Sequence, residues 1–150
     1  METEVKKYEL LDNDYVDVRH PVSKRAHRLY RIIAIREFTR ADGVVIALHE
    51  FGGFVESEDN LSHMGGAWIR GNARVFGNAN IQGEAHVHDA AAIYDDAVVR
   101  GSSTVSGHAR VYGNALICDS VIRDKTSVYG DCELFGCTIN NGSMVYGAGS

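Results

Sequence analysis

Small, aliphatic and turn-forming residues recur at a fixed interval through the C-terminal two thirds of the chain. In NARVFGNANIQGEAHV (residues 72–87), an alanine, any residue, a β-branched aliphatic, any residue and a glycine repeat every six residues. The aliphatic residues that mark this pattern are Ile69, Val75, Ile81, Val87, Ile93, Val99, Val105, Val111, Ile117, Ile122, Val128, Leu134, Ile139 and Val145. The interval is six residues except at Ile117 to Ile122 and Leu134 to Ile139, where it is five.

The repeat predicts very short strands joined by tight corners. Two residues before each aliphatic stands Ala, Ser, Thr or Cys, so both positions point to the same side of a strand. Two residues after it stands Gly, Asp or Asn, the residues that adopt left-handed backbone angles at least cost. A helix is excluded, because it needs apolar residues at a spacing near 3.6 and tolerates frequent glycine poorly. Repeats of this length stack into a solenoid.

The two short steps indicate how many strands make one coil. With three strands per coil, the first face carries Ile69, Val87, Val105, Ile122 and Ile139. The second face carries Val75, Ile93, Val111, Val128 and Val145, and the third carries Ile81, Val99, Ile117 and Leu134. Both short steps then fall at the corner between the third and first faces, and so does the longer step from Leu61 to Ile69. We therefore expect an all-β, triangular solenoid of about five coils, each of 17 to 18 residues.

Residues 1–50 do not follow the repeat and are expected to form a β-rich cap on the solenoid of residues 51–150. KKYELL, YVDV, RLYRIIAI and VVIAL are typical of short strands. A cap would cover the strand edges and apolar cross-section that a solenoid end exposes. RHPVSKRAHR (residues 19–28) is expected to be a basic loop. The alternative is a separate binding element with this loop as its contact surface.

Composition and charge narrow the class of protein. The chain has 150 residues and a net charge of −5, and its repeat half carries 6 Lys or Arg against 11 Asp or Glu. This balance disfavours direct nucleic-acid binding, which needs clustered cations. The longest apolar runs are too short for a membrane span, and the N-terminus lacks a secretion signal. Three cysteines without framework spacing suit a reducing compartment, so we expect a cytoplasmic protein without membrane contact.

The chain also resembles a known group of proteins. Hexapeptide repeats with three strands per coil resemble the left-handed β-helix of the LpxA-like acyltransferase superfamily. YRIIAIREF (30–38), FGGFVESEDNLS (51–62) and AWIRGNARVFGNA (67–79) resemble small YdcK-like β-helix proteins of bacteria and phages. The resemblance implies a left-handed helix. It also suggests an acyltransferase-like or metal-dependent enzyme as an alternative, although the coils lack the long loop insertions that shape a cleft in those enzymes.

One outward position is aromatic in every coil. The residues directly after the second-face aliphatics are Phe76, Tyr94, Tyr112, Tyr129 and Tyr146. The corresponding positions on the other two faces are mixed and mostly polar. The spacing predicts a ladder of aromatic side chains along one corner, which either reflects favourable stacking between rungs or forms a contact surface for a protein or a second subunit.

The other candidate chemistry is weaker. His86 and His88 flank the inward Val87 and could chelate zinc, but the positions one coil away hold no third histidine. Cys132 and Cys137 occupy the small inward position of consecutive repeats and are expected to be buried fillers, and Cys118 is expected at the surface. Aspartates of the corners are explained by backbone geometry. We therefore expect neither a metal, nor a cofactor, nor catalytic residues.

These expectations favour a non-enzymatic protein that acts by binding other proteins. The partners expected are a second copy of the chain, most simply in a homodimer, and a host protein or complex. The phage-like resemblance implies a factor such as a bacterial CRISPR–Cas defence complex, and hence an anti-CRISPR role. A self-assembling structural protein and the enzyme named above are the alternatives.

Overall fold

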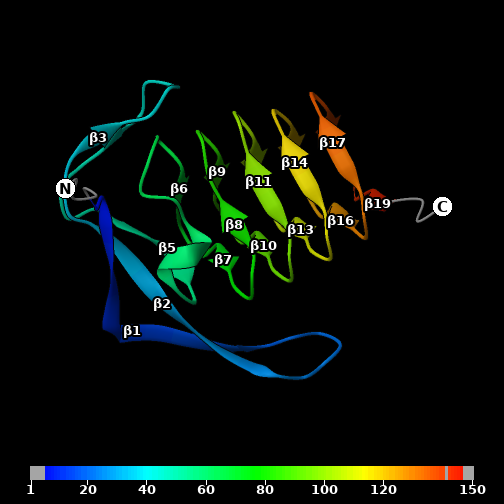
Figure 1. The fold of residues 1–150 in the computed structure, drawn as a ribbon, viewed down its shortest axis with the longest axis horizontal. Coiled ribbons are helices and arrows are strands. Elements are labelled where there is room, and N and C mark those ends of the chain that lie inside the picture. The colour runs from blue at the N-terminus through cyan, green and yellow to red at the C-terminus, as the bar shows by residue number, and fades with distance from the viewer. Residues whose placement is uncertain (1–5, 141, 147–150) are drawn as a thin grey trace, which may run out of the picture.

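The fold is a β-solenoid of about five coils, seen from the side in Figure 1. The computed structural model describes residues 6–140 and 142–146. Strands that lie one coil apart in the sequence pair in parallel, so that each face of the prism is a separate sheet. The all-β triangular solenoid expected from the repeat is confirmed.

Three sheets and one small hairpin contain all the strands of the described residues. The first face holds β6 (Trp68–Ile69), β9 (His86–Val87), β12 (Thr104–Val105), β15 (Val121–Ile122) and β18 (Thr138–Ile139). The second face holds β7 (Arg74–Val75), β10 (Ala92–Ile93), β13 (Arg110–Val111), β16 (Ser127–Tyr129) and β19 (Met144–Tyr146), and its sheet continues into β5 (Phe51–Val55), β2 (Ala26–Ala34) and β1 (Tyr8–Arg19). The third face holds β8 (Asn80–Ile81), β11 (Val98–Arg100), β14 (Leu116–Cys118) and β17 (Glu133–Phe135). The hairpin pairs β3 (Phe38–Thr39) with β4 (Val45–Ile46), and a 3₁₀ turn, η1, spans Glu58–Asn60.

The register between coils is the one expected from the five-residue steps. Val105 pairs with Val87 below it and with Ile122 above it, across the first short step. The preceding coil follows the same rule, because Val55 pairs with Val75 and Leu61 bridges to Ile81. The marked aliphatics and the small residues before them line a continuous core, in which most of these side chains have no exposed surface.

The corners adopt left-handed backbone angles. Every described glycine or aspartate that follows a marked aliphatic by two residues has a positive φ, as at Gly107 (67°) and Asp124 (62°). These corners stack closely, because a Cβ built on Gly113 would lie 2.7 Å from the amide nitrogen of Gly130 in the next coil. Glycine is therefore needed at Gly113 for both its backbone angle and its lack of a side chain. The expected corner residue Asn141 lies outside the described residues.

The N-terminal segment shares the core of the solenoid. Tyr8, Ile32 and Ile46 are fully buried against the first coil. The buried Lys7 ammonium donates hydrogen bonds to the carbonyls of Gly65 and Ala67, at 3.1 and 2.7 Å, and burial lowers the pKa of Lys7 to about 8. Arg40 similarly donates to the Gly66 carbonyl at 2.6 Å. The division of the chain at residue 50 stays a prediction.

The hairpin formed by β1 and β2 differs from the sequence-based expectation. KKYELL and YVDV do not form two short strands, because β1 runs through both. The basic loop is shorter than 19–28, since β1 ends at Arg19 and β2 begins at Ala26. Figure 1 shows the hairpin extending along the side of the solenoid, past the first coil. We call its far part, residues 15–29, the arm.

Candidate binding surface

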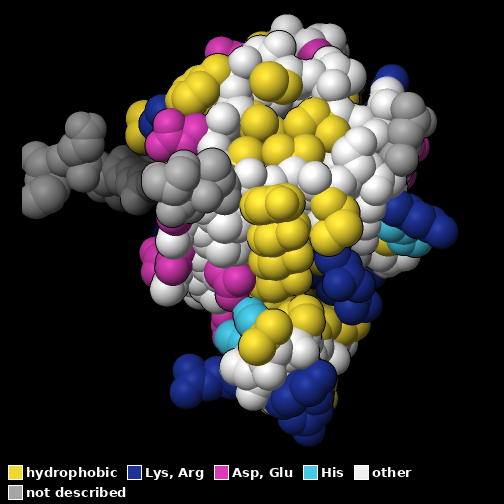
Figure 2. Space-filling view, turned by 90° about the vertical axis from the view of Figure 1, so that its right-hand side faces the viewer, with side chains coloured by type: hydrophobic (Ala, Val, Ile, Leu, Met, Phe, Trp, Pro, Cys, Tyr) yellow, Lys and Arg dark blue, Asp and Glu magenta, His cyan; other side chains and the backbone are white. Residues whose placement is uncertain are grey.

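The five aromatic residues of the second face form the expected ladder. Consecutive ring centroids of Phe76, Tyr94, Tyr112, Tyr129 and Tyr146 lie 5.0, 5.0, 5.1 and 5.3 Å apart. The first three pairs are nearly parallel, with planes inclined by 8°, 1° and 6°. Figure 2, which looks onto the C-terminal end of the solenoid, shows a hydrophobic strip with acidic groups on one flank and basic groups on the other. We refer to these five residues as the ladder.

The solenoid itself produces the stacking. Each ring follows an inward aliphatic, as Tyr129 follows the fully buried Val128, and therefore points outward at the corner. In-register pairing repeats this position at the spacing between parallel strands, as with Tyr129 and Tyr146. That spacing of about 4.8 Å places flat rings in contact, so one aromatic residue per coil is enough to form a continuous stack.

The ladder is not open along its whole length. Phe76 and Tyr94 are each 4% exposed and pack with Leu29 and Phe54 in a cluster of their own. Val16 and Val18 of β1 cover the same cluster. The expectation that the full ladder is exposed is therefore wrong for Phe76 and Tyr94, because the arm of the same chain lies over them. Burial raises the pKa of Tyr94 to about 12.

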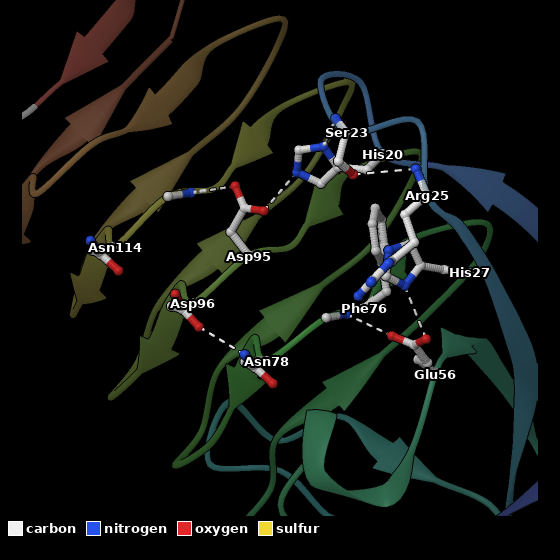
Figure 3. Close-up of a pocket in the computed structure, with 12 residues that line it drawn as sticks. His20, Ser23, Arg25, His27, Glu56, Phe76, Asn78, Asp95, Asp96 and Asn114 are labelled. Carbon is white, nitrogen blue, oxygen red and sulfur yellow. Dashed lines mark hydrogen bonds and ion pairs between the residues drawn. The ribbon is translucent and has the colours of Figure 1, made fainter.

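Two histidine–carboxylate pairs hold the arm on the solenoid (Figure 3). Nε2 of His20 lies 2.7 Å from Oδ1 of Asp95, and Nδ1 of His27 lies 3.0 Å from Oε2 of Glu56. The imidazole rings also contact the ladder, with His20 edge-on to Tyr94 at 5.4 Å. Sequence analysis missed both pairs. The only local signal was that the two histidines lie near the two ends of the basic segment 19–28, which would connect the two strands of a hairpin.

A polar hollow lies between the arm and the corner of the solenoid. It measures about 660 Å³ and is lined by His20, Ser23, Arg25, His27, Glu56, Phe76, Gly77, Asn78, Asp95, Asp96, Gly113 and Asn114. Along its solenoid wall, the amide of Asn78 donates to Asp96 at 3.0 Å. Its side chains include both basic and acidic groups, and two carboxylates already pair with the two histidines. The hollow therefore lies along the contact between the arm and the solenoid.

The other end of the ladder is open. Tyr112 and Tyr129 are partly exposed, and Tyr146 is 62% exposed. The neighbouring Met144 adds apolar surface, since it is 66% exposed. We call Tyr112, Tyr129 and Tyr146 the open rungs. A contiguous exposed aromatic strip of this kind is typical of a protein contact surface.

His86 and His88 lie side by side on the first face, with ring centroids 4.6 Å apart. Within residues 6–140 and 142–146, no group of three or more His, Cys, Asp or Glu side chains could hold a metal ion. His86 is packed near Arg40, and burial together with this cation lowers its pKa to about 4. The neutral, partly buried imidazole of His86 lies above Trp68 and belongs to the packing between the first face and the N-terminal segment.

The cysteines are only partly as expected. Cys132 is buried at the inward position, where burial raises the pKa of its thiol. Cys137 occupies the same position one repeat later but is partly exposed, because it lies in the last described coil. Cys118 is also partly exposed and not fully at the surface. All three are free thiols.

No protein-family model matches the chain, and no curated protein matches it. The described residues contain no helix that is long and apolar enough to cross a membrane. The β-solenoid that the resemblance implied is present. Its handedness and the YdcK-like family stay predictions.

Proposed function

We propose that this chain is a non-enzymatic protein-binding module whose contact surface is the open rungs of the ladder. The observation that supports this function is the change of environment along a single stack. The arm buries Phe76 and Tyr94, whereas the same stack continues as aromatic surface that is partly exposed at Tyr129 and 62% exposed at Tyr146. Aromatic side chains dominate the energetics of protein interfaces because they bury large apolar areas on a rigid frame.

A second copy of the chain is the first partner that we propose. Two-fold symmetry brings the same surface of two subunits together, so a strip such as the open rungs can pair with itself. A homodimer of this kind would cover Tyr146 and Met144, the most exposed large apolar side chains beside the ladder.

The second partner that we propose is a host protein. This step rests on the resemblance to YdcK-like hexapeptide-repeat proteins of bacteria and phages. From that resemblance we also propose that the helix is left-handed and that the protein acts in the bacterial cytoplasm. A small phage-encoded binder that perturbs a host factor, such as a CRISPR–Cas defence complex, is the specific form of the proposal.

Affinity capture with matched variants tests the binding function. Wild type, Tyr129→Arg and Phe135→Arg are immobilised and exposed to bacterial lysate. Tyr129 lies in the middle of the open rungs, whereas Phe135, which is 55% exposed, projects from the third face in the same coil. We expect wild type and Phe135→Arg to retain the same protein and Tyr129→Arg to lose it. Equal retention by all three would refute the open rungs as the binding surface.

A further inference from the structure

The arm has its own apolar contact with the solenoid, separate from the main core. Leu29 packs with Phe54, Phe76 and Tyr94 in a satellite cluster, while the aliphatics inside the prism form the main cluster. Loss of the arm contact would therefore leave the inward residues, such as Val75 and Ile93, fully packed. A small satellite cluster of this kind opens at a lower free energy than the core it lies beside.

The polar contacts of the arm are also additional to those of the solenoid. Asp95 accepts from His20 through Oδ1, but its Oδ2 accepts from the Gly113 amide at 3.0 Å within the solenoid. Glu56 likewise accepts from the Gly77 amide at 2.8 Å through the oxygen that His27 does not contact. Both carboxylates thus retain a partner in the solenoid corners when the histidines leave.

The base of the arm is irregular and its interior is self-contained. Pairing between β1 and β2 shifts register between Leu10 and Tyr15, and pairing between β2 and β5 shifts between Arg31 and Ile33. Beyond that base, the arm holds itself together, since Arg28 donates to Asp17 at 2.9 Å. Bulges bend a strand and interrupt its ladder, so the arm can leave the solenoid at this base. Once released, it is an isolated two-stranded hairpin, which is marginally stable in water, so its amides lose protection.

The outermost polar contact of the arm is made at one coil, the coil of Tyr94. Asp95 follows Tyr94 directly, but the residues that follow Tyr112 and Tyr129 are Gly113 and Gly130. The next two coils therefore lack the carboxylate that pairs with His20.

We propose that the arm is a releasable cover of the ladder. Docked, it masks Phe76 and Tyr94; released, it exposes them and lengthens the open surface from three rings to all five. The release follows from the contacts of the arm alone. Only its consequence, a longer surface for a partner, rests on the proposed binding function.

Amide hydrogen exchange tests the release on the whole chain without any partner. In His20→Ala/His27→Ala, which removes both pairs with the solenoid, we expect the amides of residues 15–29 to exchange roughly thirtyfold faster, as two lost polar contacts of ordinary strength predict. The amides of β10 and β13 should keep their wild-type exchange. His108→Ala is the matched control, because His108 is an exposed histidine at a corner of the solenoid.

A second variant guards against an effect on the turn of the arm, because Nδ1 of His20 also accepts from the Val22 amide at 3.0 Å. Val18→Asp leaves that turn intact and places a charge against the ladder cluster, so it should accelerate the same amides. Unchanged exchange of residues 15–29 in both variants would overturn the proposal. Equal acceleration in the arm and in β10 and β13 would also overturn it, since the arm would then be an integral part of the fold. A failure of the binding function would leave these exchange rates unaffected.

Discussion

Tyr94 and Tyr112 lie ring over ring in adjacent coils, with centroids 5.0 Å apart and planes inclined by 1°, yet they face different surroundings. Tyr94 is 4% exposed beneath the arm, whereas Tyr112 is partly exposed at its edge. The boundary between the covered and the open part of the ladder therefore falls between two residues that occupy the same position in successive coils. It is set by where the arm ends.

The inward alanines should tolerate no added volume. Ala109 is fully buried between Ala91 and Thr126 of the neighbouring coils, so Ala109→Leu must push stacked backbones apart. We expect a loss of roughly 1–3 kcal/mol in the free energy of unfolding, measured by urea denaturation. Ala90→Leu is the control, because Ala90 is exposed at a corner one coil below. If Ala109→Leu were as stable as Ala90→Leu, the inward assignment would fail.

The corner glycines should differ according to how closely the next coil approaches. Gly113 and Gly136 have similar φ angles, 70° and 66°. A Cβ on Gly113 would lie 2.7 Å from backbone, whereas a Cβ on Gly136 would meet nothing within 4 Å. Gly136→Ala should cost about 1 kcal/mol from its backbone angle alone, and Gly113→Ala should cost about 1–3 kcal/mol more. Equal melting temperatures for the two variants would contradict the close stacking of corners.

His86 should make stability depend on mildly acidic pH. Its pKa is lowered from 6.5 to about 4 by burial, so the folded state favours the neutral ring and protonation favours unfolding. Above pH 6.5 the ring is neutral in both the folded and the unfolded protein, so it does not lower the free energy of unfolding. As the pH drops from 6.5 toward 4, the unfolded state binds the proton first and the free energy of unfolding falls. Between pH 7 and 4.5, wild type should lose on the order of 2 kcal/mol more than His86→Gln. Parallel stability curves for the two proteins, or an NMR titration of His86 near 6.5, would show that the ring is not buried as described.

The solenoid was predictable because its information is repeated. Each coil restates the positions of the aliphatic, small and corner residues, and steps such as Ile117 to Ile122 fix the number of strands per coil. The ladder followed from the same arithmetic. The arm did not, because His20 and Asp95 are 75 residues apart and belong to segments with no common period. Its apolar face, with Val16 and Val18, is too short to identify the surface that it covers.

The mass of the protein in solution tests most directly whether the open rungs form an interface. Tyr129 stacks between Tyr112 and Tyr146, so Tyr129→Arg interrupts the strip while the adjacent Val128 stays in the core. A dimer forms only if burial of the apolar strip, at ~25 cal/mol per Å², outweighs the entropy lost on association. One charge at the centre of the strip prevents that burial. By light scattering, we predict a dimer for wild type and for Phe135→Arg and a monomer for Tyr129→Arg. A monomeric wild type, or an unchanged mass for Tyr129→Arg, would contradict self-association through the ladder.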